Sequence, residues 1–245
     1  MDAKLTTRWY SPRLEQEVLV VRWGHYGTPV LLFPTAGGDG EECERFLMIK
    51  VLAPLLEAGR IKVYSCDSVA GRIMSEGRSS PQHVSWMHAQ FQAFVYKEVV
   101  PAIRRDCERD DVEVISAGSS IGAFNALAMA CRYPDAFSKA ICLSGTFDLV
   151  RFLPAGMYTH DFYYASPIHF LPNLDGGSQL EQLRRRFILF AFGEGRWEDP
   201  QESWRMADIL GKKGVPNRVD SWGPTYDHNW VTWREMLPHY LDRMA

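Results

Sequence analysis

The chain has 245 residues, of which 46% are hydrophobic and 23% charged, and its formal net charge is −3. This is an ordinary globular balance, with enough apolar residues for a large core. Proteins that bind nucleic acid or an anionic membrane carry a basic surface, and the net charge of this chain gives no sign of one. The first residues contain no apolar leader, and no apolar run is long enough to span a membrane. We expect a soluble, cytoplasmic protein.

The cysteines and the missing motifs also exclude several classes of chemistry. Five cysteines are scattered through the chain without C-x-x-C spacing, so we expect reduced, mostly buried thiols (Cys43, Cys66, Cys107, Cys131 and Cys142). The sequence has no phosphate-binding loop, no H-E-x-x-H pair and no complete G-x-G-x-x-G. We therefore expect no metal and no cofactor.

Apolar patterning along the chain alternates between strands and helices. The early β-rich runs predict antiparallel strands at the start of a sheet (8–10, 17–23 and 29–33). Later strands are expected at 61–66, 112–115, 139–144, 187–192 and 218–222, and helices at 41–56, 82–103, 121–133, 202–212 and 230–241. This alternation predicts an α/β fold, a mostly parallel central sheet with helices on both faces, in one domain over 1–245. The segment 151–185 is less regular, aromatic early and helical late.

One stretch, VEVISAGSSIGAFNALAMA over 112–130, combines a buried strand with a helix. Between them lies Gly118-Ser119-Ser120-Ile121-Gly122, a G-x-S-x-G match. A strand that becomes a helix within two residues holds its central residue in a strained conformation, which requires small residues on either side. The pattern predicts a nucleophile elbow with Ser120 as the nucleophile.

A serine nucleophile needs a base that a third group orients. In this architecture an acid and then a histidine follow the serine, each on a loop after a later strand. His228 is the histidine that lies after the last predicted strand and before the final helix. The loop after 187–192 offers three carboxylates for the acid, and we favour Glu198, then Asp199, then Glu194. Asp148, after the preceding strand, stays open as an outside candidate.

Two backbone N–H groups are needed to hold the oxyanion. We assign the first to Ile121, which follows the nucleophile, and the second to Ala36 in the loop after the third strand, with Thr35 as the next choice. We expect Thr35, Gly37, Ser119 and Trp230 to contact substrate. The aromatic stretch from Phe152 to Phe170 either covers the pocket or packs as a core insert.

The elbow, the loop FPTAGG, the segment GEGRWED and the ending YDHNWVTW resemble the α/β-hydrolase superfamily. More narrowly, they resemble compact esterases of the esterase D, enterochelin esterase and mycolyltransferase branch, over essentially the whole chain. The resemblance implies the α/β-hydrolase fold with a minimal cap. It also implies that the second donor maps onto Ala36, and that Gly195-Arg196-Trp197-Glu198 matches the G-x-x-[D/E] context of the acid. The loop lacks the H-G-G-G of many lipases, which favours small, accessible esters.

We therefore expect a serine hydrolase that acts on small or short-chain carboxylic esters through a Ser-His-acid triad and an acyl-enzyme. One alternative is an acyltransferase, which passes the same acyl group to an alcohol. Another is a non-catalytic hydrolase-like binding protein. The expected partner is a small-molecule ester, without nucleic acid or membrane, and the sequence leaves homo-oligomerisation open.

Overall fold

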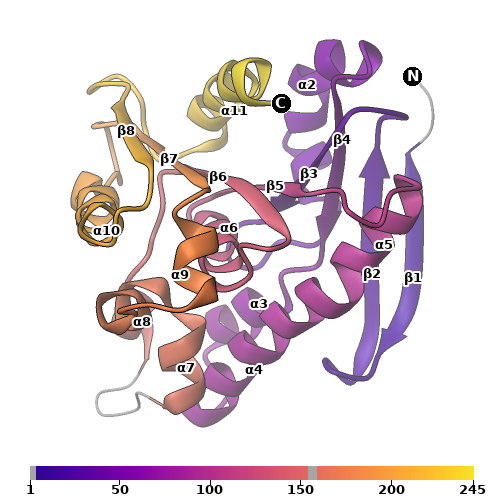
Figure 1. Ribbon diagram of the computed structural model, residues 1–245. Coiled ribbons are helices and arrows are strands. Elements are labelled where there is room, and N and C mark those ends of the chain that lie inside the picture. The colour runs from indigo at the N-terminus through magenta and orange to yellow at the C-terminus, as the bar shows by residue number, and fades with distance from the viewer. Residues whose placement is uncertain (1–3, 154–158) are drawn as a thin grey trace.

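A computed structural model describes residues 4–153 and 159–245 of the chain. Its centre is a single eight-stranded sheet (Figure 1). The strands are β1 (Leu5–Ser11), β2 (Gln16–Trp23), β3 (Thr28–Phe33), β4 (Ile61–Cys66), β5 (Val114–Ser119), β6 (Phe137–Leu143), β7 (Phe187–Phe192) and β8 (Asn217–Ser221). From β3 to β7 these strands are mostly apolar and largely buried on both faces, as expected of a parallel sheet covered by helices.

The strand order is β1-β2-β4-β3-β5-β6-β7-β8. β2 is antiparallel to β1 and to β4, whereas every pair from β4 to β8 is parallel. The expectation that 29–33 forms an antiparallel strand is wrong, because β4 lies between β2 and β3 and pairs in parallel with β3. The mostly parallel sheet is confirmed.

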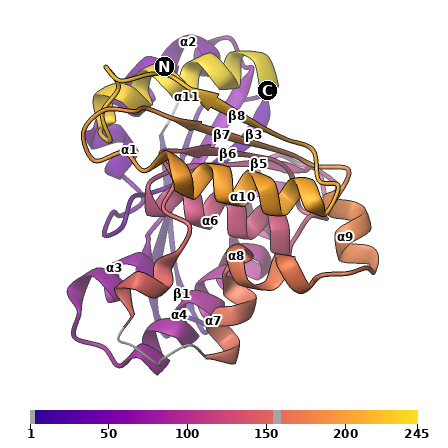
Figure 2. The same cartoon turned by 90° about the vertical axis from the view of Figure 1, so that its left-hand side faces the viewer.

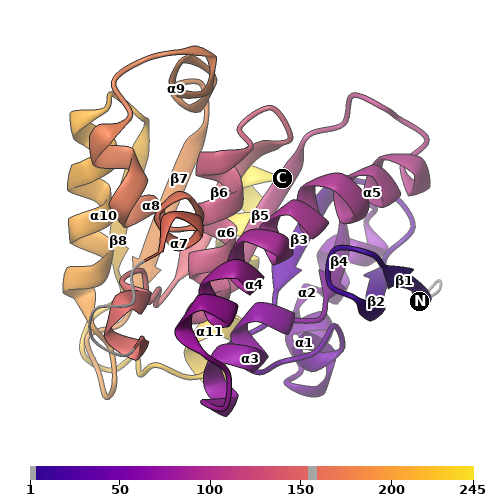
Figure 3. The ribbon, with the colours of Figure 1, turned by 90° about the horizontal axis from the view of Figure 1, so that it is seen from below.

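The longer helices are α2 (Met48–Glu57), α3 (Val69–Glu76), α4 (Pro81–Phe94), α5 (Val100–Asp106), α6 (Ile121–Arg132), α10 (Pro200–Lys212) and α11 (Trp230–Met244). Figure 2 shows α2 and α11 on one face of the sheet and α3, α4, α6 and α10 on the opposite face. Figure 3, from below, shows α4 and α6 lying across that second face. Both faces of the sheet are therefore covered.

Two predicted helices differ from the observed ones. The helix expected at 41–56 divides into α1 (Glu42–Arg45) and α2, because Leu47 adopts a left-handed conformation with φ of 64°. The helix expected at 82–103 continues from α4 through a π-helical turn, Val95–Val99, into α5. No glycine in the sequence indicates the division at Leu47 or the π-helical turn at Val95–Val99.

The segment after β6 has no large cap among the described residues. It forms a 3-10 turn (Leu149–Phe152), three short helices, α7 (His160–Ala165), α8 (Pro167–Phe170) and α9 (Ser178–Leu183), and a second 3-10 turn at Leu171–Asn173. Phe162 and Phe170 are buried in the core, whereas Phe152 is 51% exposed. Tyr158, which belongs to the predicted aromatic stretch, lies outside the described residues.

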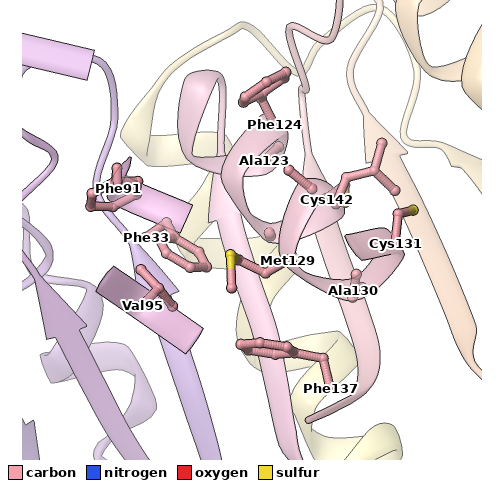
Figure 4. Packing of buried hydrophobic residues seen from close by; sticks show 14 of the residues in the cluster. Phe33, Phe91, Val95, Ala123, Phe124, Met129, Ala130, Cys131, Phe137 and Cys142 are labelled. Carbon is pink, nitrogen blue, oxygen red and sulfur yellow. The ribbon is translucent and has the colours of Figure 1, made fainter. Parts of the chain in front are cut away.

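Two apolar layers fill the space between sheet and helices. In the larger one, Phe33 from β3 packs edge-on against Phe91 of α4, with ring centroids 6.2 Å apart, and Val95 and Met129 lie close by (Figure 4). The smaller layer joins the sheet to α2 and α11. The packed sheet is a rigid base for the loops that leave its carboxyl edge.

All five cysteines are free, and four of them are buried, as expected. Within the described ranges, none of the helices combines the length and the apolar character needed to cross a bilayer.

Candidate active site

The carboxyl ends of the parallel strands bring the candidate residues to one edge of the sheet. Register pairs Phe33 with Gly118, Ser119 with Leu143, and Phe192 with Ser221. The loops that follow these strands therefore leave side by side. They carry Thr35 and Ala36, Ser120, Ser144, Glu198 and His228.

The elbow at Ser120 has the predicted strain. Ser120 lies between β5 and α6 with φ of 57° and ψ of −121°, outside the regions that L-residues prefer. A Cβ at Gly118 would lie 2.3 Å from the Gly122 carbonyl carbon, and one at Gly122 would lie 2.6 Å from the carbonyl oxygens of Phe33 and Pro34. Both glycines are therefore required by close backbone contacts, which explains the motif physically.

Backbone bonds anchor the elbow to the next strand. The N–H of Ser120 donates to the Leu143 carbonyl at 3.0 Å, and the N–H of Thr146 donates to the Ser120 carbonyl at 3.3 Å. The first N–H groups of α6 have no acceptor within the helix. Ile121, the first helical residue, therefore has an amide without an acceptor in its own helix, beside the serine and at the positive end of the helix dipole.

His228 is paired with Glu198. The distance from His228 Nδ1 to Glu198 Oε2 is 3.7 Å, longer than a hydrogen bond but close enough for an ion pair when the imidazole is protonated. The carboxylate side chain is 1% exposed and that of the histidine 21%. A buried acid beside a partly exposed imidazole is the arrangement that orients a general base.

Hydrogen bonds between the two loops hold this pair together. The N–H of His228 donates to the Arg196 carbonyl at 3.0 Å, and the N–H of Arg196 donates to Asp227 Oδ1 at 2.6 Å. The N–H of Gly195 donates to the Tyr226 carbonyl at 3.0 Å. Three bonds thus fix the histidine loop against the acid loop.

The other candidate acids have different partners. Glu194 accepts from Ser221 Oγ at 2.6 Å. Asp199 precedes α10 and lies 3.7 Å from Arg151 Nη1, without capping the helix through its side chain. Asp148 caps the 3-10 turn at Val150 and pairs with Arg205 at 3.2 Å. Of the carboxylates in the described residues, Glu198 is the one within 4 Å of the His228 ring nitrogens.

Two further residues that the sequence did not indicate, Ser144 and Trp233, contact Glu198 and His228. Ser144 Oγ donates to Glu198 Oε1 at 2.6 Å, and Trp233 Nε1 donates to Ser144 Oγ at 2.9 Å. The Trp233 ring also packs edge-on against His228, with centroids 5.1 Å apart. Ser144 adopts φ of 45°, and this strain beside the acid was not visible in the sequence LSGT.

The loop after β3 carries the candidate second oxyanion donor. The N–H of Thr35 donates to Glu42 Oε2 at 2.7 Å, so it is occupied. Among the described residues, the Ala36 N–H has no acceptor, which favours Ala36 over Thr35 as the backbone donor. Gly37 next to it is exposed, with open space where a side chain would be.

The remaining expected substrate contacts are spread around this edge. Ser119 is the buried last residue of β5. Trp230 begins α11 and stacks on the Phe46 ring with centroids 4.9 Å apart and an interplanar angle of 2°. In the part of the chain that the structure describes, no cluster of three His, Cys, Asp or Glu side chains could hold a metal ion.

Comparisons with known structures show the fold. A ferulic acid esterase superposes with a TM-score of 0.73 at 14% identity, covering 99% of both chains. An S-formylglutathione hydrolase from Agrobacterium tumefaciens gives a TM-score of 0.71 at 12% identity, covering 98% of this chain and 93% of the other. The protein MPT51 from Mycobacterium tuberculosis gives 0.72 at 14% identity, covering 99% and 97%. The expected α/β-hydrolase fold is confirmed.

No curated protein sequence matches the chain. The sequence model of a family described as "Putative esterase" matches residues 63–244, which is most of the chain and includes Ser120, Glu198 and His228. The chain therefore belongs to this esterase family, a family of carboxylic ester hydrolases.

Proposed function

We propose that the protein hydrolyses small carboxylic esters with Ser120 as nucleophile, His228 as general base and Glu198 as the acid that orients the imidazole. The observation that carries this proposal is the pairing of His228 Nδ1 with the buried Glu198, at the sheet edge where the strained Ser120 lies. With Nδ1 directed at the carboxylate, Nε2 is the nitrogen left to accept a proton.

The reaction follows from these roles. Ser120 Oγ attacks the ester carbonyl carbon while His228 Nε2 takes the hydroxyl proton, and the tetrahedral oxyanion accepts from the amides of Ile121 and Ala36. The C–O bond to the alcohol breaks, and His228 returns the proton to the leaving oxygen. Water, deprotonated by His228, then attacks the acyl carbon of the acyl-enzyme. The bond to Ser120 Oγ breaks, the carboxylic acid product leaves, and His228 returns the proton to Ser120.

The proposed substrates are small for a structural reason. Between β6 and β7 the described residues form only short helices and turns, so no large cap encloses a long acyl chain there. The partly exposed His228 and the exposed Gly37 also support a shallow, accessible site. The free cysteines support a reducing, cytoplasmic location for this activity.

The test is hydrolysis of p-nitrophenyl esters of increasing chain length by the wild type and by matched variants. Ser120→Ala and His228→Ala should each lose several orders of magnitude in kcat/KM. Glu198→Gln should lose about 10²-fold or more, whereas Glu194→Gln and Asp199→Asn, in the same loop, should stay within about 3-fold of wild type. Unchanged turnover by Ser120→Ala would remove the proposal.

A further inference from the structure

We propose that Glu42 is a positioning residue. Its carboxylate holds Thr35 through two hydrogen bonds, a contact that we call the clamp, and so fixes the loop after β3 that carries the oxyanion donor Ala36. The inference rests on the proposed esterase function, because it assigns a role next to the Ala36 donor of that function. Glu42 is the first residue of α1 and is 7% exposed. In the sequence it is only the second residue of the helix expected at 41–56.

Both carboxylate oxygens of Glu42 bind one residue. Oε2 accepts from the backbone N–H of Thr35 at 2.7 Å, and Oε1 accepts from Thr35 Oγ1 at 2.6 Å. Hydrogen bonds to a carboxylate are shorter and about twice as strong as those between neutral groups. Two of them on the same residue restrict both the backbone and the side-chain torsion of Thr35.

Glu42 has no basic partner among the described residues. Arg45, on the same helix, pairs with Asp39 at 2.8 Å instead. A buried carboxylate without a cation is costly unless its hydrogen bonds are satisfied, and here the two donors both come from Thr35. Gly38 packs directly on this group, since a Cβ there would lie 2.5 Å from Glu42 Cδ. The carboxylate is therefore confined to the position from which it holds Thr35.

The clamp determines how the next peptide is oriented. The Thr35 carbonyl accepts from the N–H of Gly38 at 3.3 Å, and the Ala36 carbonyl accepts from Ser68 Oγ at 3.3 Å. Because a trans peptide is planar, the Ala36 N–H points opposite to the Thr35 carbonyl. Holding Thr35 therefore fixes the direction of the Ala36 N–H. Because Glu42 also occupies the Thr35 N–H, Ala36 is left to donate to an oxyanion.

The decisive variants separate geometry from charge. In Glu42→Leu both bonds are lost, and we expect kcat for p-nitrophenyl acetate to fall about 100-fold with KM within about 3-fold, as when one oxyanion donor is lost. Glu42→Gln keeps an acceptor for the Thr35 N–H and can donate to its hydroxyl, so it should retain at least about a tenth of the wild-type kcat. Phosphonylation of Ser120 by a fluorophosphonate should slow in parallel with kcat.

Glu44→Gln is the matched control, because the same substitution on the same helix leaves the clamp intact. Glu44 binds Lys4 and Trp23. We expect its kcat to equal that of wild type, while the melting temperature of every variant is measured alongside. A merely structural role for Glu42 would lower the melting temperature and leave kcat of the folded protein unchanged.

A wild-type kcat in folded Glu42→Leu would refute the proposed role of Glu42, and the proposed esterase function would not be affected. The esterase proposal fails separately, if Ser120→Ala keeps its turnover. Should Glu42→Leu not fold, Gly38→Ala decides instead, because its methyl group would displace the carboxylate. A loss of kcat of about 10-fold or more in Gly38→Ala supports the clamp, and an unchanged kcat overturns it.

Discussion

Removing the Ser144 hydroxyl should weaken both the fold and the active site. This hydroxyl donates to Glu198 Oε1 at 2.6 Å and accepts from Trp233 Nε1 at 2.9 Å. A hydrogen bond to a charged group contributes about 1.5–3 kcal/mol, and an unpaired buried N–H costs about 1–3 kcal/mol. Ser144→Ala should therefore lower the free energy of unfolding by about 3 kcal/mol.

The catalytic loss follows from the freedom that the carboxylate gains. Glu198 meets His228 through Oε2 and is held through Oε1 by Ser144. Without the second contact the carboxylate can rotate away from the imidazole. We expect kcat/KM for p-nitrophenyl acetate to fall about 10- to 100-fold, which corresponds to about 1.4–2.7 kcal/mol in the activation barrier.

A second substitution separates stability from catalysis. Ser144 has φ of 45°, a conformation that costs an L-residue about 1–2 kcal/mol and glycine almost nothing. Ser144→Gly should therefore be about 1 kcal/mol more stable than Ser144→Ala, while both lose the same activity. Ser116→Ala is the control, because its buried hydroxyl donates to the Ala126 carbonyl at 2.9 Å, away from His228. Urea unfolding and ester hydrolysis measure the two effects, and wild-type activity in both Ser144 variants would refute the reasoning.

Three further predictions concern the framework. Gly122→Ala should lower the free energy of unfolding, measured in urea, by about 3 kcal/mol or more, because the added Cβ would lie 2.6 Å from two carbonyl oxygens. A change below about 1 kcal/mol would contradict this close contact. Gly211→Ala, inside α10 with open space around it, should instead stabilise by about 0.5–1 kcal/mol, and a loss of stability would contradict this. Burial lowers the pKa of His88 from 6.5 to about 4, so the unfolded chain binds the proton more tightly than the folded protein. The contribution of His88 to the free energy of unfolding should be fully present above about pH 6.5 and should fall by about 3 kcal/mol towards pH 4. His88→Leu should remove most of this pH dependence, since neither ring nitrogen has a partner among the described residues; an unchanged pH profile would exclude His88 as its source.

The elbow could be predicted because its cause is local. Gly118 and Gly122 are required by contacts within a few residues of Ser120 and with the neighbouring β3, and the strand and helix around them have clear patterns. The prediction of His228 as the base rests on its order in the chain, after the last strand. Glu198 lies 3.7 Å from His228 Nδ1 in the structure, whereas the sequence left the choice of acid open among neighbouring carboxylates. Its catalytic role stays a prediction.

What the sequence did not indicate depends on contacts between distant positions. Ser144 meets Glu198 and Trp233 across 54 and 89 positions, and each of the three looks ordinary in its own segment. The parallel pairing of β3 follows from the insertion of β4 beside β2, which no local pattern encodes. Glu42 binds Thr35 only seven positions away, yet its burial arises because α1 folds against the loop.

The most direct test of the central claim is to locate a covalent adduct. The protein is treated with a fluorophosphonate, its intact mass is measured, and the modified peptide is sequenced by mass spectrometry. The account predicts a single adduct on Ser120, absent from Ser120→Ala and formed far more slowly in His228→Ala. An adduct on another residue, or equal labelling of Ser120 without His228, would contradict an activated serine at this elbow.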